Sequence, residues 1–232
     1  MSKIKNYVFS KIFPWKSIND INYQRPSIDI SIRKNFRVLF IDDNELNVLD
    51  DLRHEYKYDI TYKKIKLDSI YDAEAYDIVL CDLDGVQPES ELQGAKLVKD
   101  IRTAYPSKQI IMYTAHNLTM DQMEIVLKSA DKRIRKGVRI EHWEAILDEC
   151  ILDLIDPTLA WIKIKKFLED KQVKTIDIAR FENIFVNSYL SGKTENIKDL
   201  AKEFSYQKNT DEIIKVLIPI LSKIISMKGV IR

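Results

Sequence analysis

Short apolar runs alternate with helix-compatible segments through the middle of the chain, from about residue 36 to residue 155. The first run, VLFI at 38–41, is apolar throughout, which is typical of a strand buried on both faces of a parallel sheet. We expect strands at 38–41, 60–65, 78–81, 109–113 and 132–135, and helices at 45–56, 69–75, 91–105, 120–129 and 139–155. This alternation predicts an α/β domain built from βαβ units around a parallel sheet.

The pattern changes at Asp156-Pro157, a cap and first-turn signal for a helix, and no convincing strand pattern follows it. Three or four helices are expected, at 157–170, 175–190, 195–204 and 211–228. The last of these is apolar on nearly every face, and Pro219 is expected to kink it. Because Lys215 and Lys223 interrupt this helix and it is short for a bilayer, we expect the central helix of a small all-α domain and not a membrane span.

Length and charge suggest three parts. The 232 residues suit one full domain and a smaller one, and the 45% hydrophobic and 31% charged residues are typical of a globular protein. Residues 1–37 carry eight basic and two acidic side chains, residues 157–232 carry fourteen and nine, and the stretch between them has a net charge near −10. Such an acidic stretch fits either a cation site or simple solubility. We expect a basic N-terminal extension at 1–35, an α/β domain at 36–155 and a helical domain at 156–232.

The cellular location is predicted from the cysteines and the start of the chain. Cys81 and Cys150 lie in an expected strand and an expected helix, without the close spacing of a zinc site, so a reducing cytoplasm suits them. Residues 1–15 lack the apolar segment of a signal peptide. Their mixed apolar and basic residues fit either a surface-binding amphipathic helix or a segment docked on protein. We expect a cytoplasmic protein, and the role of its basic start stays open.

Polar side chains follow the expected strands at one edge of the sheet. Asp42 and Asp43 follow the first strand, Asp82 the third, Thr114 the fourth and Lys136 the fifth. In an open parallel sheet, ligands collect outside the carboxyl ends of the strands. Three converging carboxylates would repel one another and so call for a divalent cation, and oxygen ligands that handle phosphate favour Mg²⁺. With a hydroxyl and an ammonium beside them, these residues favour phosphoryl transfer to an aspartate.

The same stretches resemble a known family, the response-regulator receiver domains, over residues 36–154. The matching pieces are VLFIDDN at 38–44, YDIVLCD at 76–82, IIMYTA at 110–115 and ADKRIRK at 130–136. Any one of these pieces is a weak signal, but together and in order they are specific. The resemblance implies a doubly wound, five-stranded parallel sheet of the flavodoxin-like receiver type, which the all-α domain would follow.

The resemblance also implies roles for single residues. Asp82 would accept the phosphoryl group and bind Mg²⁺. Asp43 would bind the ion directly, Asp42 would support it, and the backbone carbonyl of Asp84 would be the third protein ligand. Two further residues, Thr114 and Lys136, would contact the phosphoryl oxygens. Thr114 would also move inward as the switch.

The chain departs from the family pattern at positions that concern signal transmission. Gly137 stands where the family has a proline after its lysine, and Arg133 replaces the aromatic residue that couples to the threonine. The loop after Asp82 is longer than usual before its glycine, which we place at Gly94. We therefore expect the phosphoryl chemistry to be retained and its transmission to differ.

Two neighbours of the expected site, Asp84 and His116, lie two residues past Asp82 and Thr114. They are candidates for tuning the lifetime of the phosphoryl group. The alternative for each is an ordinary solvent-facing residue of a loop.

The expected function is that of a response regulator in a two-component phosphorelay, with Asp82 phosphorylated by a histidine kinase or histidine phosphotransfer protein. The receiver would itself catalyse this transfer and a slow hydrolysis, and the sequence carries no motif of a dedicated output enzyme. Residues 156–232 are expected to bind protein, either a second copy or another partner.

Two alternatives to this function stay open. One is a DNA-binding transcriptional regulator, because 197–204 mimics the first helix of a helix-turn-helix, although the next helix is too apolar to read a groove. The other is a phosphate sink or degenerate receiver that acts as an interaction module.

Overall fold

The computed structural model describes residues 15–64, 67, 69–86, 89–193, 210–228 and 230. They form two compact units: an α/β unit, Pro26–Leu154, and a helical unit made of the described residues up to Arg25 and from Ile155 onward. The described part of the expected N-terminal extension is therefore divided, because residues 15–25 belong to the helical unit and residues 26–35 to the α/β unit.

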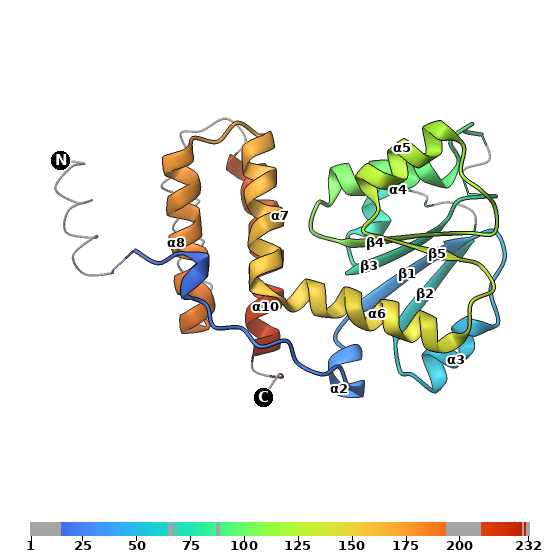
Figure 1. Cartoon of the computed structure of the whole chain (residues 1–232), viewed down its shortest axis with the longest axis horizontal. Coiled ribbons are helices and arrows are strands. Elements are labelled where there is room, and N and C mark those ends of the chain that lie inside the picture. The colour runs from blue at the N-terminus through green and yellow to red at the C-terminus, as the bar shows by residue number, and fades with distance from the viewer. Residues whose placement is uncertain are drawn as a thin grey trace. The chain divides into compact units, whose positions relative to one another are not determined.

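The α/β unit is built on one sheet of five parallel strands (Figure 1). The strands are β1 (Arg37–Asp42), β2 (Asp59–Lys64), β3 (Ile78–Asp82), β4 (Gln109–Thr114) and β5 (Lys132–Arg135). Their order is β2-β1-β3-β4-β5, so the chain winds outward from β1 in both directions. Every residue of β3 is buried, as expected for a strand with helices on both faces. The predicted α/β fold with a doubly wound, five-stranded parallel sheet is confirmed.

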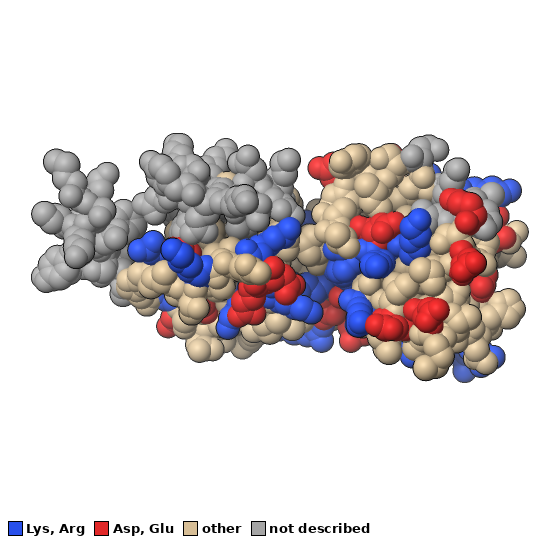
Figure 2. Space-filling model, turned by 90° about the horizontal axis from the view of Figure 1, so that it is seen from above, with Lys and Arg blue, Asp and Glu red and all other residues tan. Residues whose placement is uncertain are grey.

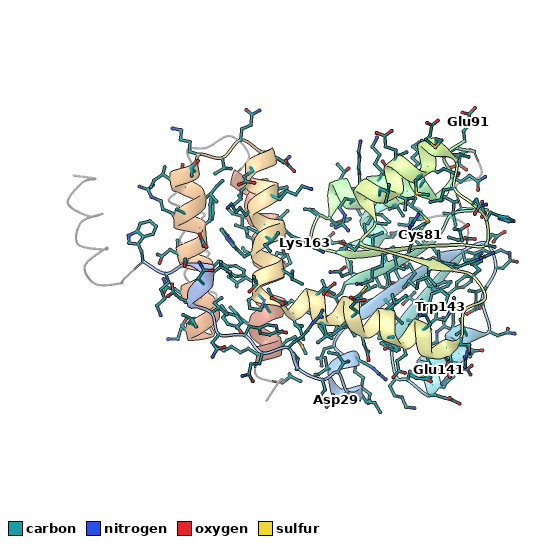
Figure 3. All side chains as sticks on the ribbon, in the orientation of Figure 1. Asp29, Cys81, Glu91, Glu141, Trp143 and Lys163 are labelled. Carbon is teal, nitrogen blue, oxygen red and sulfur yellow. The ribbon has the colours of Figure 1, made fainter. Side chains whose placement is uncertain are left out.

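Helices cover both faces of this sheet. On one face lie α4 (Gly94–Ala104) and α5 (Met120–Ser129), and on the other lie α3 (Val48–His54) and α6 (Ile140–Ile155) (Figure 1). On the α6 side, Trp143 points toward the sheet (Figure 3), where its ring meets those of Phe40 and Tyr113. The segment expected as a short second helix is a 3-10 turn, η2 (Ile70–Ala73).

A buried arginine ties the segment before β1 to α6. Arg33 ends the short helix α2 (Ile30–Arg33), and its guanidinium lies 2.6 Å from Glu144 Oε1 and 2.6 Å from Asp148 Oδ2. The Tyr58 hydroxyl donates to Asp148 Oδ1 at 2.5 Å. Because the Arg33 side chain is only 9% exposed, water screens these ion pairs little. This cluster explains why residues 26–35 pack with the α/β unit.

The helical unit contains α7 (Pro157–Asp170), α8 (Thr175–Ser191), α10 (Thr210–Lys228) and a 3-10 turn, η1 (Ile18–Asp20) (Figure 1). These helices lie within one residue of the expected ranges 157–170, 175–190 and 211–228. The Asp156 carboxylate accepts hydrogen bonds from the backbone N–H groups of Thr158 and Leu159, which fixes the start of α7. Pro157 occupies the first turn, where its missing N–H costs nothing.

The helical unit has an apolar core of its own. The rings of Trp161 and Phe185 lie 5.6 Å apart between α7 and α8. Buried residues of all three helices complete this core, among them Ile164, Leu168, Ile178, Phe181, Val186, Leu217, Leu221 and Ile224. The segment around η1 packs against it, since the backbone N–H groups of Lys16 and Ile18 donate to side chains of α8 at 2.8 and 2.9 Å.

Two expected features lie outside the described residues: the helix at 195–204 with its helix-turn-helix pattern, and most of the amphipathic start. Within the described part of the chain, no helix combines the length and apolar character needed to cross a membrane. On the face of the α/β unit seen in Figure 2, acidic and basic side chains lie side by side. The acidic side chains of this unit therefore do not form one continuous patch on that face.

Candidate functional site

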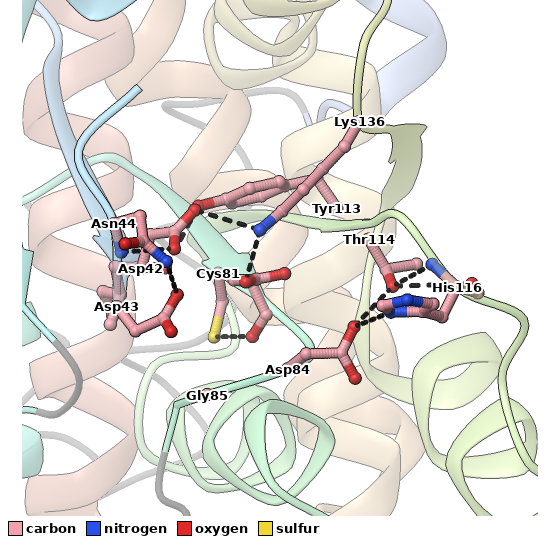
Figure 4. A network of polar contacts seen from close by, with 12 residues as sticks. Asp42, Asp43, Asn44, Cys81, Asp84, Gly85, Tyr113, Thr114, His116 and Lys136 are labelled. Atoms are coloured by element: carbon pink, nitrogen blue, oxygen red, sulfur yellow. Dashed lines mark hydrogen bonds and ion pairs between the residues drawn. The ribbon is translucent and has the colours of Figure 1, made fainter. Parts of the chain in front are cut away.

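Three carboxylates meet at the carboxyl edge of the sheet. Asp42 ends β1, Asp43 follows it, and Asp82 ends β3 beside it, so the parallel pairing of β1 with β3 brings them together (Figure 4). One oxygen of each carboxylate lies within 4.8 Å of the others. Asp42 is fully buried, Asp82 is 1% exposed and Asp43 is half-buried. The expected convergence of these three residues at one edge of the sheet agrees with their placement, and their roles stay predictions.

Lys136 supplies the cation of this cluster. Its Nζ lies 2.5 Å from Asp82 Oδ2 and 3.2 Å from Asp42 Oδ2. The residue follows β5, and its backbone N–H donates to the Thr114 carbonyl at 2.9 Å, which holds the loop against β4. We call the group formed by Asp42, Asp43, Asp82 and Lys136 the acidic site. It carries three carboxyl groups and one ammonium.

The surroundings shift the ionisation of these groups in different directions. Burial raises the pKa of Asp82 to about 6, and the hydrogen bond and charge of Lys136 only partly oppose it. Burial also acts on Asp42, but hydrogen bonds from Tyr113 and the Asn44 backbone outweigh it and lower the pKa. The interaction with Asp42, followed by burial, raises the pKa of Asp43. The site concentrates negative charge that one ammonium cannot balance.

The donor set fits a small, hard, divalent cation. All its groups are carboxylate oxygens, which Mg²⁺ prefers over softer nitrogen and sulfur ligands. Asp82 Oδ1 is buried and has no hydrogen-bond partner among the described residues. A buried polar atom without a partner is costly, so this oxygen is available as a ligand. Asp42, Asp43 and Asp82 are therefore the residues that could hold such an ion.

Tyr113 belongs to the site and was missed by sequence reasoning. It lies on β4 with no exposed surface, and its hydroxyl donates to Asp42 Oδ2 at 2.5 Å. The Lys136 ammonium lies 5.1 Å from the centre of its ring. Burial raises the pKa of Tyr113, so the hydroxyl keeps its proton. The only sign of this role in the sequence is a tyrosine within the strand QIIMYT, and the sequence does not show which group its hydroxyl would bond.

The Thr114 hydroxyl forms hydrogen bonds with residues outside the acidic site. It donates to Asp84 Oδ2 at 3.1 Å and accepts a hydrogen bond from the His116 backbone N–H at 3.0 Å. The His116 ring nitrogen Nδ1 lies 3.0 Å from the same Asp84 oxygen (Figure 4). Asp84 and His116, expected as neighbours that tune the site, thus form one network with Thr114. A contact between Thr114 and a phosphoryl group stays a prediction.

Two glycines let the loop after β3 approach the site. Gly85 has a φ of +74°, and a Cβ there would lie 2.6 Å from Asp43 Cγ. The backbone N–H of Gly94 donates to the Leu83 carbonyl at 3.0 Å, and a Cβ on Gly94 would overlap the Asp82 carbonyl. The sequence pointed to Gly94 and missed Gly85. The Asp84 carbonyl as a cation ligand stays a prediction.

The departures from the family pattern have local physical reasons. Gly137 has a φ of +85°, which proline cannot adopt because its ring holds φ near −65°. Arg133 is exposed on β5, and its guanidinium lies 3.1 Å from Met123 Sδ.

No protein-family model matches the sequence, and no curated protein matches it. Solved structures do resemble it. One is the receiver domain of the sensor histidine kinase PA1611 from Pseudomonas aeruginosa PAO1, whose structure has a magnesium ion coordinated in the active site cleft. It is 22% identical in sequence, with a TM-score of 0.42, and the match covers 50% of this chain and 97% of that one. A CheY-like receiver domain protein from Methanospirillum hungatei JF-1 is 19% identical with a TM-score of 0.39, over 50% of this chain and 93% of that one.

A longer match is NtrX from Brucella abortus in complex with ADP, which is 17% identical with a TM-score of 0.43. It covers 72% of this chain but only 34% of the NtrX chain. The fold is assigned from the strands themselves. By the order and parallel pairing of its five strands, the unit Pro26–Leu154 has the fold of a response-regulator receiver domain.

Proposed function

We propose that this protein is a cytoplasmic response regulator that accepts a phosphoryl group on Asp82 from a histidine kinase or histidine phosphotransfer protein. The observation that carries the proposal is the environment of Asp82: it is nearly fully buried among carboxylates, with a lysine ammonium 2.5 Å from Oδ2 and, among the described residues, no partner on Oδ1. Such an arrangement costs stability and is explained by a ligand or reaction that uses it.

The proposed step is a direct phosphoryl transfer. An oxygen of the Asp82 carboxylate attacks the phosphorus of a phosphohistidine, and the new O–P bond forms as the P–N bond breaks. The electron pair of the P–N bond returns to the imidazole of the donor, which takes up a proton from water. Because the pKa of Asp82 is about 6, this carboxyl is mostly ionised at neutral pH and can act as the nucleophile.

The other residues of the site act through charge and position. Lys136, already hydrogen-bonded to Asp82, would pair with a phosphoryl oxygen. We propose that Asp42, Asp43, Asp82 and the backbone carbonyl of Asp84 hold Mg²⁺, which when bound would neutralise charge on the transferred group. Thr114 would exchange its hydrogen bond with Asp84 for one with the phosphoryl group. Slow hydrolysis of the acyl phosphate would then reset the protein.

Intact-mass spectrometry with a small phosphodonor and Mg²⁺ tests this chemistry. The wild-type protein should gain one phosphoryl group, which hydroxylamine removes as expected of an acyl phosphate. Asp82→Asn should gain none, whereas Asp59→Asn, a substitution at a carboxylate with 56% exposure on β2, should be labelled like wild type. Equal labelling of the Asp82 variant, or an unlabelled wild type, would overturn the proposal.

We propose that the helical unit provides the output by binding protein, with a second copy of this chain as the first candidate. Ile162 on α7 and Ile176 on α8 are 56% and 57% exposed, so the unit presents large apolar side chains to solvent. Sedimentation equilibrium of the full chain, with and without phosphorylation, should show a change in self-association of about 1 kcal/mol. Ile162→Glu should weaken the dimer. A monomer under every condition would exclude self-association and leave a different protein as the partner.

The DNA-binding alternative is tested in parallel. A DNA-binding helical unit should retain duplex DNA with a steep dependence on salt. We give it second place, because the helix that follows the helix-turn-helix pattern is too apolar to read a groove.

A further inference from the structure

Tyr113 joins the acidic site to the core under α6. Its hydroxyl contacts Asp42 on one side, at 2.5 Å. Its ring lies edge-on to that of Trp143 on the other side, with centroids 5.7 Å apart and planes at 73°. Figure 4 shows the tyrosine reaching from β4 toward Asp42 and Lys136. One buried side chain thus contacts both a carboxylate of the site and a helix outside it.

The hydroxyl of Tyr113 fixes the orientation of Asp42. Asp42 Oδ1 accepts a hydrogen bond from the Asn44 backbone N–H at 2.8 Å, while Oδ2 accepts from Tyr113 and from Lys136. Without Tyr113, Oδ2 would depend on the ammonium of Lys136, which is shared with Asp82. A buried carboxylate that loses a donor is under-solvated and turns toward another partner. The hydrogen bond from the tyrosine therefore fixes the orientation of Asp42.

The ring of Tyr113 is packed so tightly that its position constrains Trp143. The Phe40 ring lies 4.9 Å from that of Tyr113 and 6.2 Å from that of Trp143, so the three rings form one cluster. Trp143 is 2% exposed. Because protein cores are close-packed, a shift of one of these buried rings displaces its neighbours. Trp143 belongs to α6, which ends at Ile155, one residue before the Asp156 cap of α7.

We propose that Tyr113 is a positioning residue of the acidic site, which orients Asp42 for a bound cation and passes changes at the site to Trp143 of α6. The proposal rests on the cation-binding role given above and adds how that site is held and sensed. It also supplies a route that does not need an aromatic residue at position 133, where Arg133 is exposed.

The test measures Mg²⁺ binding and tryptophan emission in the full chain. Mg²⁺ alone is titrated into wild type, Tyr113→Phe and Tyr62→Phe, and its affinity is measured by calorimetry. Tyr62 is the matched control, because its hydroxyl donates at 3.1 Å to the backbone carbonyl of Asp42 and not to the carboxylate. We expect Tyr113→Phe to weaken Mg²⁺ binding by about tenfold and Tyr62→Phe by no more than about twofold.

The emission of Trp143 provides the second readout. Saturation with Mg²⁺ should change the emission of wild type, and Trp143→Phe, which keeps two of the three tryptophans, should abolish the change. Tyr113→Phe should lose most of this change even when it is saturated with Mg²⁺, while Tyr62→Phe should retain it. Thermal unfolding of each variant shows whether it is folded. A purely structural role of Tyr113 would lower stability but leave the emission change of the saturated protein intact.

The outcomes separate this proposal from the proposed function. Equal Mg²⁺ affinity in wild type and Tyr113→Phe would overturn the positioning role. Calorimetric binding with an unchanged Trp143 emission would overturn the sensing role and leave the cation site standing. A protein that binds Mg²⁺ in a Tyr113-dependent way but is never phosphorylated on Asp82 would retain this inference and lose the proposed function.

Discussion

Replacement of Asp82 by asparagine tests the electrostatics of the site without any ligand. Burial raises the pKa of Asp82 from 3.8 to about 6, because the side chain is almost completely removed from water. Between these two pH values the unfolded chain releases the proton while the folded protein retains it. The folded state is therefore increasingly disfavoured as the pH rises through this range, and the loss is complete above the folded pKa.

The magnitude follows from the size of the pKa change. A carboxyl whose pKa rises from 3.8 to about 6 on folding lowers the free energy of unfolding by about 3 kcal/mol at neutral pH. Asparagine resembles the neutral acid and does not titrate. We expect the free energy of unfolding of Asp82→Asn, relative to wild type, to increase by about 3 kcal/mol between about pH 4 and about pH 7 and to level off above.

Urea unfolding of both proteins across this pH range measures the difference directly. Groups outside the acidic site titrate equally in both proteins and cancel. A flat difference for Asp82→Asn would refute the burial effect. A difference that falls as the pH rises would mean that Lys136 stabilises the carboxylate more than burial disfavours it.

Three further predictions use other residues. Asp43→Ala should abolish Mg²⁺ binding in calorimetry and phosphorylation in intact-mass spectra, yet raise the stability of the ion-free protein, because the interaction with Asp42 raises the pKa of Asp43. Gly85→Ala should cost about 1–2 kcal/mol in urea unfolding and also weaken Mg²⁺ binding, whereas Gly192→Ala, with a similar φ of +71° and open space around it, should cost only stability. Lys108 is 7% exposed and burial lowers its pKa from 10.5 to about 8, so the unfolded chain binds this proton more tightly. The stability of wild type relative to Lys108→Met should therefore rise by about 3 kcal/mol from about pH 8 to about pH 10.5, and a flat difference would refute the shift.

The sequence by itself determined the α/β fold and most of the acidic site. The strands follow from apolar runs such as VLFI at 38–41, because a strand covered on both faces needs no polar position. Asp42, Asp82 and Lys136 could be assigned to one edge because the carboxyl ends of parallel strands always meet there. This inference needs only the order of the elements and no knowledge of side-chain contacts. The starts and ends of α7 and α8 were likewise predictable from local signals such as the Asp156-Pro157 cap.

Only the tertiary structure decided which side chains act together. The Tyr113 hydroxyl meets a carboxylate 71 residues earlier in the chain, and the Thr114 hydroxyl meets Asp84 instead of Asp82. Arg33 joins α6 through partners more than 110 residues away, which divides a segment that composition had suggested was a single extension. Such pairings depend on strand register, loop conformation and the need of each buried polar group for a partner, and no local pattern of residues encodes them. Local patterns therefore specify where elements begin and which edge their polar ends share, while the packed core selects the partners.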